Sequence, residues 1–78
     1  EPVMKKAAQN YTIVIHEAEE GGYWAEVPSL PGCFSQGETI EETLTNTKDA
    51  VISHIDALRE RGNAVPQNDR LVISSIDL

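Results

Sequence analysis

Residues 21–42, GGYWAEVPSLPGCFSQGETIEE, carry most of the structural information in this chain of 78 residues. The opening pair of glycines supplies the positive φ angles that a tight β-hairpin needs. Residues 23–27 then predict a strand that returns antiparallel to the segment before the turn. Residues 28–32 end that strand because proline has no N–H for ladder pairing. Within them, Pro31 and Gly32 fit the two central positions of a type II turn.

The second half of this stretch predicts a short strand over residues 33–36 and then a helix. Gly37 frees the backbone to leave the sheet, and the helix begins near residue 38 or 39. Thr39 and Glu42 match a capping box, in which the hydroxyl caps one free amide and the carboxylate reaches back to another. Apolar side chains then recur at helical spacing, with Thr47 filling the gap in the series Ile40, Leu44, Val51, Ile55 and Leu58. Gly62 suits the C′ position that ends the helix.

Two further segments outside this stretch predict strands. Residues 11–16, YTIVIH, are rich in β-branched side chains, and residues 70–76, RLVISSI, are similar. In the first segment Tyr11, Ile13 and Ile15 share one face, and Thr12, Val14 and His16 share the other. Because both sets contain apolar residues, this strand is predicted to lie in the interior of the sheet.

The predicted order of elements is therefore β-β-β-α-β. A right-handed helical crossover brings the last strand beside the first. We expect an α+β fold, a four-stranded mixed sheet in the order 3-2-1-4 with one helix on one face. A single domain is predicted over residues 11–78, behind a flexible tail over residues 1–10 in which Met4 looks like a natural start.

Composition restricts the class of protein. The chain has thirteen acidic and six basic residues, a net charge of −7. Such a surface repels phosphate backbones and attracts basic proteins, which disfavours direct binding of DNA or RNA. The single cysteine, Cys33, excludes an intrachain disulfide and a cysteine-based zinc site. No long apolar run indicates a membrane span, so a reducing cytoplasm is the expected compartment.

One helix covers only one face of the predicted sheet, and the uncovered face is half apolar. We expect that face to dock another copy of the chain, as a dimer or tetramer, or a different protein. Trp24 is the expected anchor because tryptophan often dominates interfaces. Acidic residues of the first helical turn are expected, as a secondary possibility, to contact the partner as well. The predicted partner-binding residues are Trp24, Glu26, His16, Val14, Glu41 and Glu42.

Catalysis is a weaker hypothesis than partner binding. A metal-dependent nuclease would need clustered carboxylates around magnesium, and five side chains could suggest one: His16, Glu17, Glu19, Glu20 and Glu26. Acids at a turn tip are ordinarily solvating residues, however. Cys33 is interpreted as a small buried hydrophobe, and His54 as the edge of the packed helix stripe. The sequence therefore predicts no catalytic residue, no cofactor and no metal site.

Residues 21–51, GGYWAEVPSLPGCFSQGETIEETLTNTKDAV, resemble the N-terminal domain of HicB antitoxins. The matching pattern is a Gly-Gly hairpin, Y-x-A-E-V-P-x-L-P-G-C, and then x-S-x-G-x-T-x-E-E before a helix. Its length and compactness make chance agreement improbable. The resemblance implies a partial ribonuclease H-like fold. It also implies a non-enzymatic role, binding a HicA-type toxin, which is a small basic ribonuclease that cleaves messenger RNA with a histidine.

The resemblance leaves alternatives open. Many HicB proteins continue into a DNA-binding helix-turn-helix or ribbon-helix-helix, whereas this sequence ends at Leu78, so DNA binding is not carried over. A short family member and a shortened protein both fit this expectation. The function hypotheses are a HicB-like antitoxin, a stand-alone homo-oligomer without a toxin partner and, third, a metal-dependent ribonuclease.

Overall fold

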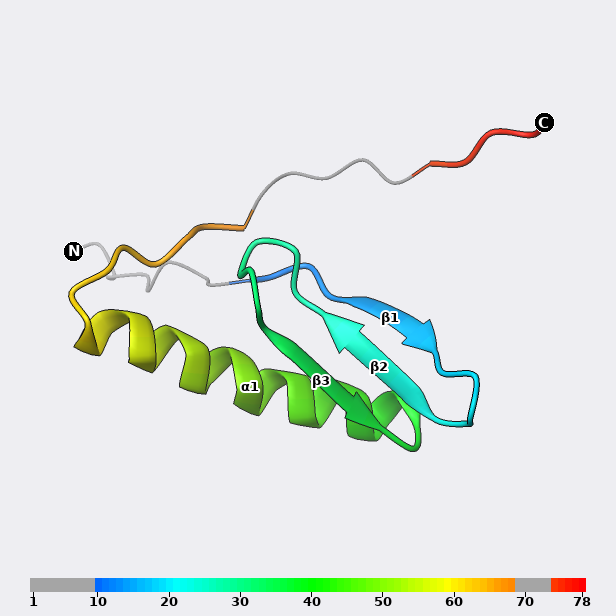
Figure 1. The fold of residues 1–78 in the computed structure, drawn as a ribbon, viewed down its shortest axis with the longest axis horizontal. Helices are drawn as coiled ribbons and strands as arrows, with labels where there is room; N and C mark the ends of the chain where they lie inside the picture. Colours follow the sequence, from blue (N-terminus) through cyan, green and yellow to red (C-terminus); the bar gives the residue numbers. More distant parts are fainter. Residues whose placement is uncertain (1–9, 69–73) are drawn as a thin grey trace, which may run out of the picture.

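The computed structural model describes residues 10–68 and 74–78. In chain order it contains β1 (Val14–Glu17), β2 (Tyr23–Glu26), β3 (Phe34–Gly37) and α1 (Ile40–Glu60). The three strands form one antiparallel sheet in the order β1-β2-β3. The helix runs along one side of the sheet and packs against β3 and β2 (Figure 1). The predicted α+β class and the order of the first three strands and the helix are confirmed.

The β1–β2 hairpin has the predicted turn. Gly21 and Gly22 have φ angles of 104° and 77°. The N–H of Ala18 donates to the carbonyl of Gly22 over 3.0 Å and closes the loop. A Cβ on Gly22 would lie 2.9 Å from the carbonyl oxygen of Gly37. The hairpin tip is therefore tied closely to the end of β3.

The predicted strand boundaries need correction. The first strand was expected over residues 11–16, but β1 begins at Val14, which pairs with Glu26 at the end of β2. Residues 11–13 have no partner on β2 because that strand stops one residue earlier than predicted, ahead of Pro28. The third strand begins one residue later than predicted, at Phe34.

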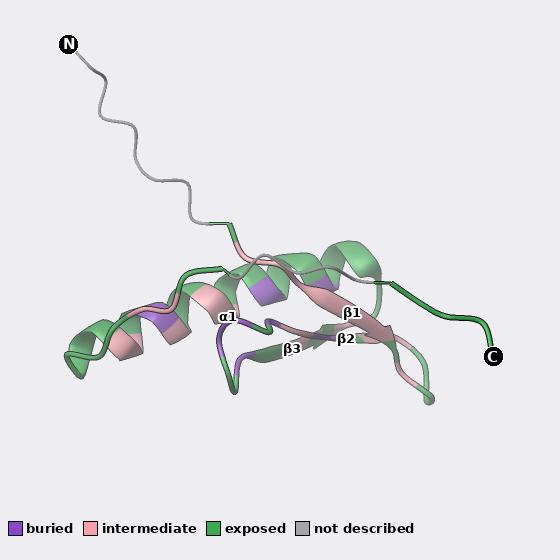
Figure 2. Ribbon diagram, turned by 90° about the horizontal axis from the view of Figure 1, so that it is seen from above, coloured by how far each residue is buried: buried purple, intermediate pink, exposed green. Residues whose placement is uncertain are grey.

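The loop between β2 and β3 is folded into the core. Val27 donates to Cys33 over 3.2 Å, and Cys33 donates back to Leu30 over 3.0 Å. Gly32 has a φ of 84°, in agreement with the predicted type II turn. Leu30 is fully buried and belongs to the core cluster, whose buried members are Val27, Leu30, Cys33 and Ile55 (Figure 2). The proline-bracketed loop thus serves both as a turn and as a core element.

Both ends of α1 have the predicted caps. The Thr39 hydroxyl accepts from the N–H of Glu42 over 3.0 Å, and the Glu42 carboxylate accepts from the N–H of Glu38 over 2.6 Å. At the other end, Gly62 has a φ of 74° and donates to Arg59, while Asn63 donates to Leu58. This pair of bonds is a Schellman motif.

The buried stripe of α1 differs from the prediction. Ile40 and Leu44 were expected in the core but are 49% and 43% exposed. Thr43 and Thr47 are fully buried instead, and their hydroxyls donate to the helix carbonyls four residues earlier. These short side chains allow α1 to approach β3 closely. Of the other predicted positions, Ile55 is buried in the core cluster, Val51 packs against that cluster, and Leu58 is half-buried.

The predicted fourth strand is not confirmed. Most of it lies outside the described residues, and residues 74–76 carry no strand pairing. The chain after α1 does return to the segment ahead of β1. The Tyr11 hydroxyl donates to the carbonyl of Pro66 over 2.6 Å, and the N–H of Thr12 donates to Asn68 Oδ1 over 2.9 Å. A fourth strand beside β1, and with it the interior position of β1, stays a prediction.

Candidate partner-binding face

The face of the sheet turned away from α1 gathers four of the predicted partner-binding residues. Strand pairing sets His16 opposite Trp24 and Val14 opposite Glu26. Ala25, which alternates with these residues on β2, is fully buried on the helix side. Val14, His16, Trp24 and Glu26 therefore share one face. We call it the open face.

The side chains on the open face support one another. The rings of His16 and Trp24 stack with centroids 4.0 Å apart and an interplanar angle of 12°. Nε2 of His16 lies 2.7 Å from Oε2 of Glu26, at hydrogen-bond distance between the ring N–H and the carboxylate. The histidine is thus held between an indole and a carboxylate. These contacts restrict the side-chain rotamers of the open face.

Phe34 extends the open face and was missed by the sequence analysis. It pairs with Glu26 across β2 and β3, and its side chain is 58% exposed. Its ring centroid lies 6.4 Å from that of Trp24 at a tilt of 50°. Burial of Cys33 could have signalled that its neighbour points outward. Three aromatic rings, those of His16, Trp24 and Phe34, thus follow one another across the sheet.

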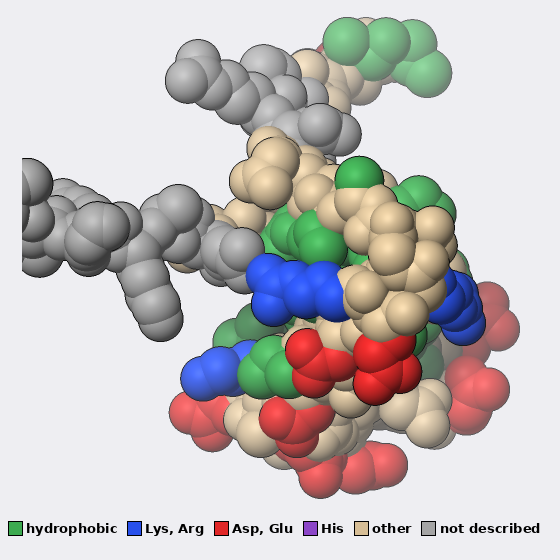
Figure 3. Space-filling model, turned by 90° about the vertical axis from the view of Figure 1, so that its left-hand side faces the viewer, with side chains coloured by type: hydrophobic (Ala, Val, Ile, Leu, Met, Phe, Trp, Pro, Cys, Tyr) green, Lys and Arg blue, Asp and Glu red, His purple; other side chains and the backbone are tan. Residues whose placement is uncertain are grey.

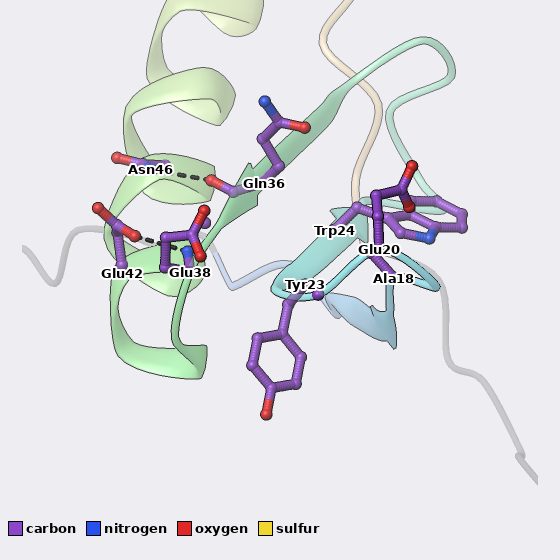
Figure 4. Close-up of a pocket in the computed structure, with 10 residues that line it drawn as sticks. Ala18, Glu20, Tyr23, Trp24, Gln36, Glu38, Glu42 and Asn46 are labelled. Atoms are coloured by element: carbon purple, nitrogen blue, oxygen red, sulfur yellow. Dashed lines mark hydrogen bonds between the residues drawn. The ribbon is translucent and has the colours of Figure 1, made fainter.

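A hollow of about 670 Å³ adjoins the open face near the hairpin tip. Figure 4 shows Glu38 and Glu42 on the helix side of it and Trp24 and Glu20 on the hairpin side. A second hollow of about 540 Å³ continues along β3 toward Phe34. Both hollows are lined by Trp24, Gln36 and Asn46, and we call them together the β3 groove.

On its helix side, the β3 groove is held in place by a hydrogen bond between α1 and β3. Asn46 Nδ2 donates to the backbone carbonyl of Gln36 over 2.8 Å, which ties α1 to the outer edge of β3. This bond satisfies one of the carbonyl groups that an edge strand would otherwise leave open. Trp24 lines both hollows and therefore lies where they meet.

The two acidic residues predicted from the first helical turn are placed differently from the other four. Glu42 lines the first hollow, where one of its carboxylate oxygens caps Glu38. Glu41 is exposed on the same turn of α1. Glu42 adjoins the β3 groove, whereas Glu41 does not line it.

Of the five residues considered for catalysis, His16 and Glu26 lie within hydrogen-bond distance of each other. Within residues 10–68 and 74–78, no three histidine, cysteine or carboxylate side chains converge closely enough to hold a metal ion.

Cys33 is buried, and this burial raises the pKa of its thiol. A raised pKa disfavours the nucleophilic thiolate. His54 lies half-buried beside Cys33 and Phe34 around a shallow hollow. No helix in the described part of the chain is long and apolar enough to cross a membrane.

Burial of Cys33 gives a testable expectation. Iodoacetamide should alkylate this thiol slowly in the folded protein and rapidly in urea. Because the folded state keeps the thiol neutral, the associated stability is complete below the unfolded-state pKa of about 8.5. It is then lost as the pH rises toward the higher folded-state value. Urea titrations should therefore show that the free energy of unfolding falls less between about pH 7 and about pH 9.5 in Cys33→Ala than in the wild type. Equal alkylation rates with and without urea would contradict the assignment.

Comparisons with known proteins agree on one family. A family model described as the HicB-like antitoxin of bacterial toxin–antitoxin systems matches residues 11–76. A UPF0150 protein of Thermoplasma acidophilum is 41% identical over 59 residues, spanning 76% of this chain and 86% of the relative. A UPF0150 protein of Synechocystis is 39% identical over 70 residues, spanning 90% of this chain and 89% of the relative.

Two solved structures share the fold. The N-terminal domain of the Burkholderia pseudomallei antitoxin HicB superposes with a TM-score of 0.67 at 28% identity, covering 87% of this chain and 98% of that domain. A chain from a HicA3 and HicB3 toxin–antitoxin complex superposes with a TM-score of 0.66 at 32% identity. That alignment covers 77% of this chain and 69% of the other.

Proposed function

This chain belongs to the HicB-like antitoxin family, and from that premise we propose that it binds and neutralises a basic, messenger-RNA-cleaving toxin of the HicA type. The observation that carries the proposal is the family match over residues 11–76, together with the shared fold in a HicA3–HicB3 complex. The proposed role is non-catalytic and acts by protein–protein contact. Its proposed compartment is the cytoplasm, where messenger RNA is translated.

The proposed contact surface is the open face, and its chemistry suits such a partner. Trp24 and Phe34 provide exposed aromatic surface, the class of side chain that most often anchors interfaces. Glu26 lies among them, and the net charge of −7 favours encounter with a basic protein. The stacked pair of His16 and Trp24 fixes the geometry in advance.

Co-expression with the small basic protein encoded by a neighbouring gene tests the proposal. That protein is expected to stop growth when expressed alone, and this chain is expected to restore growth and to co-purify with it. An unrelated basic protein, such as lysozyme, controls for attraction by charge alone and should not co-purify at about 0.15 M salt. A toxic neighbour that this chain neither binds nor counteracts would refute the antitoxin role.

A second candidate function is self-association without a toxin. Exposed Trp24 and Phe34 favour it, since a second copy could cover the same open face. Light scattering coupled to gel filtration measures the oligomer directly. Under this alternative, Phe34→Ser converts a dimer or tetramer to monomer. If the oligomer persists in that variant, the open face remains available for a different protein.

A further inference from the structure

Among the described residues, most of the acidic charge of residues 10–47 lies at the end that carries the hairpin tip and the start of α1, whereas Glu26 lies at the opposite end of β2, paired with Phe34. Residues 10–47 contain no lysine or arginine and seven glutamates, namely Glu17, Glu19, Glu20, Glu26, Glu38, Glu41 and Glu42. Strand pairing and the close approach of Gly22 to Gly37 bring the hairpin and the helix start together in space. The β3 groove begins at this end.

The opposite end of the molecule is different. Figure 3 views the end at which α1 finishes, and there the Lys and Arg side chains lie among Asp and Glu side chains. In residues 48–68, three cations are matched by three carboxylates: Lys48, Arg59 and Arg61 against Asp49, Asp56 and Glu60. Charge complementarity with a cationic partner is therefore concentrated at the β3 groove within the described part of the chain.

The aromatic surface of the groove adds a second kind of attraction. Trp24 is 37% exposed even though His16 stacks on its indole, and its remaining surface lines both hollows. A cation over an indole is attracted by the negative face of the ring. Carboxylates of Glu20 and Glu38 line the same hollow and would accept hydrogen bonds from that cation.

We propose that the β3 groove seats an arginine side chain of the basic partner, with its guanidinium against Trp24 and its N–H groups directed to Glu20 and Glu38. The inference rests on the proposed antitoxin function and specifies the partner chemistry of that surface. Arginine fits better than lysine because its planar group can stack on the indole while donating to separate acceptors. Phe34 extends the apolar part of the groove beside the arginine stem.

Trp24 is the only tryptophan of the chain, so its fluorescence reports directly on the groove. The probe is the basic protein of the neighbouring gene, with its own emission subtracted. Binding is expected to shift or quench the Trp24 emission. The double variant Glu20→Gln/Glu38→Gln should bind about tenfold more weakly, and Phe34→Ala should lose a similar factor.

Matched controls separate the groove from general effects of charge and apolar area. The double variant Asp56→Asn/Glu60→Gln removes as much charge from the far end of α1. Ile52→Ala removes an apolar side chain that is 50% exposed, close to the 58% of Phe34. Both controls should keep wild-type affinity to within about twofold.

Chemical blocking of the partner distinguishes arginine from lysine. Phenylglyoxal treatment of its arginines should abolish the change in Trp24 emission, whereas reductive methylation of its lysines should leave it intact. Circular dichroism checks that each treated partner remains folded. The opposite pattern, or tight binding with unchanged Trp24 emission and unaffected groove variants, overturns the inference and leaves the antitoxin role standing. Absence of any binding by the wild-type chain overturns the proposed function itself.

Discussion

Replacing Gly37 by alanine is expected to lower the free energy of unfolding by about 3 kcal/mol. The added Cβ would lie 2.7 Å from the backbone nitrogen of Thr43 and 2.8 Å from its hydroxyl oxygen. A rotamer change cannot relieve a contact with a backbone atom, so α1 must move away from β3. In a domain of this size, about 3 kcal/mol corresponds to a fall in Tm of about 12–24 °C. Thermal unfolding followed by circular dichroism measures it.

Gly62→Ala is the matched control for Gly37→Ala. A Cβ at Gly62 meets nothing within 4 Å, but its φ of 74° strains a non-glycine residue. This variant should cost only about 1 kcal/mol, because it tests backbone strain without a steric clash. A Gly37→Ala protein that melts as high as the wild type would show that α1 and β3 tolerate a wider spacing.

Leu30→Ala is the second substitution with a large expected effect, about 2–5 kcal/mol of unfolding free energy. Leu30 has no exposed surface and belongs to the same core cluster as Val27, Cys33 and Ile55. Its removal leaves a cavity between the β2–β3 loop and α1, because the two prolines of that loop limit how far it can collapse. Urea denaturation measures this loss of unfolding free energy. The slope of that free energy against urea concentration should be the same in the variant and the wild type.

The control for Leu30→Ala uses the same chemical change at an exposed position. Leu44→Ala on α1 removes a side chain that is 43% exposed and should cost less than about 1 kcal/mol. Equal losses at the two positions would mean that the loop does not contribute to the core in the way its burial indicates.

Local chemistry made several features predictable from the sequence. A hydroxyl three residues ahead of a glutamate specifies the helix start, and two adjacent glycines specify the hairpin, because each depends only on neighbouring residues. Strand alternation placed Val14, His16, Trp24 and Glu26 on one face for the same reason. The assignment of these four residues to one face does not depend on packing between elements that are distant in the sequence.

Features that depend on packing between elements were not predictable in this way. Burial of Cys33 indicates that Phe34 points outward, but its position beside Glu26 and Trp24 follows from the register of β3 against β2, which a strand of four residues does not specify by itself. Helical spacing placed Ile40 and Leu44 in the core, yet the close approach at Gly37 turns Thr43 and Thr47 inward instead. The buried threonines look polar in sequence, but their hydroxyls bond within the helix.

Among the described residues, the uneven distribution of charge also produces a permanent electric dipole, with its negative pole at the hairpin tip and the start of α1. In the field of a cationic body a dipole experiences a torque and rotates before the two surfaces touch. At physiological ionic strength that field extends about 8 Å, so the rotation takes place across the last few layers of water. Under the proposed function, collisions with the partner that begin in other orientations would be turned toward the β3 groove, and added salt would shorten the distance over which this rotation occurs.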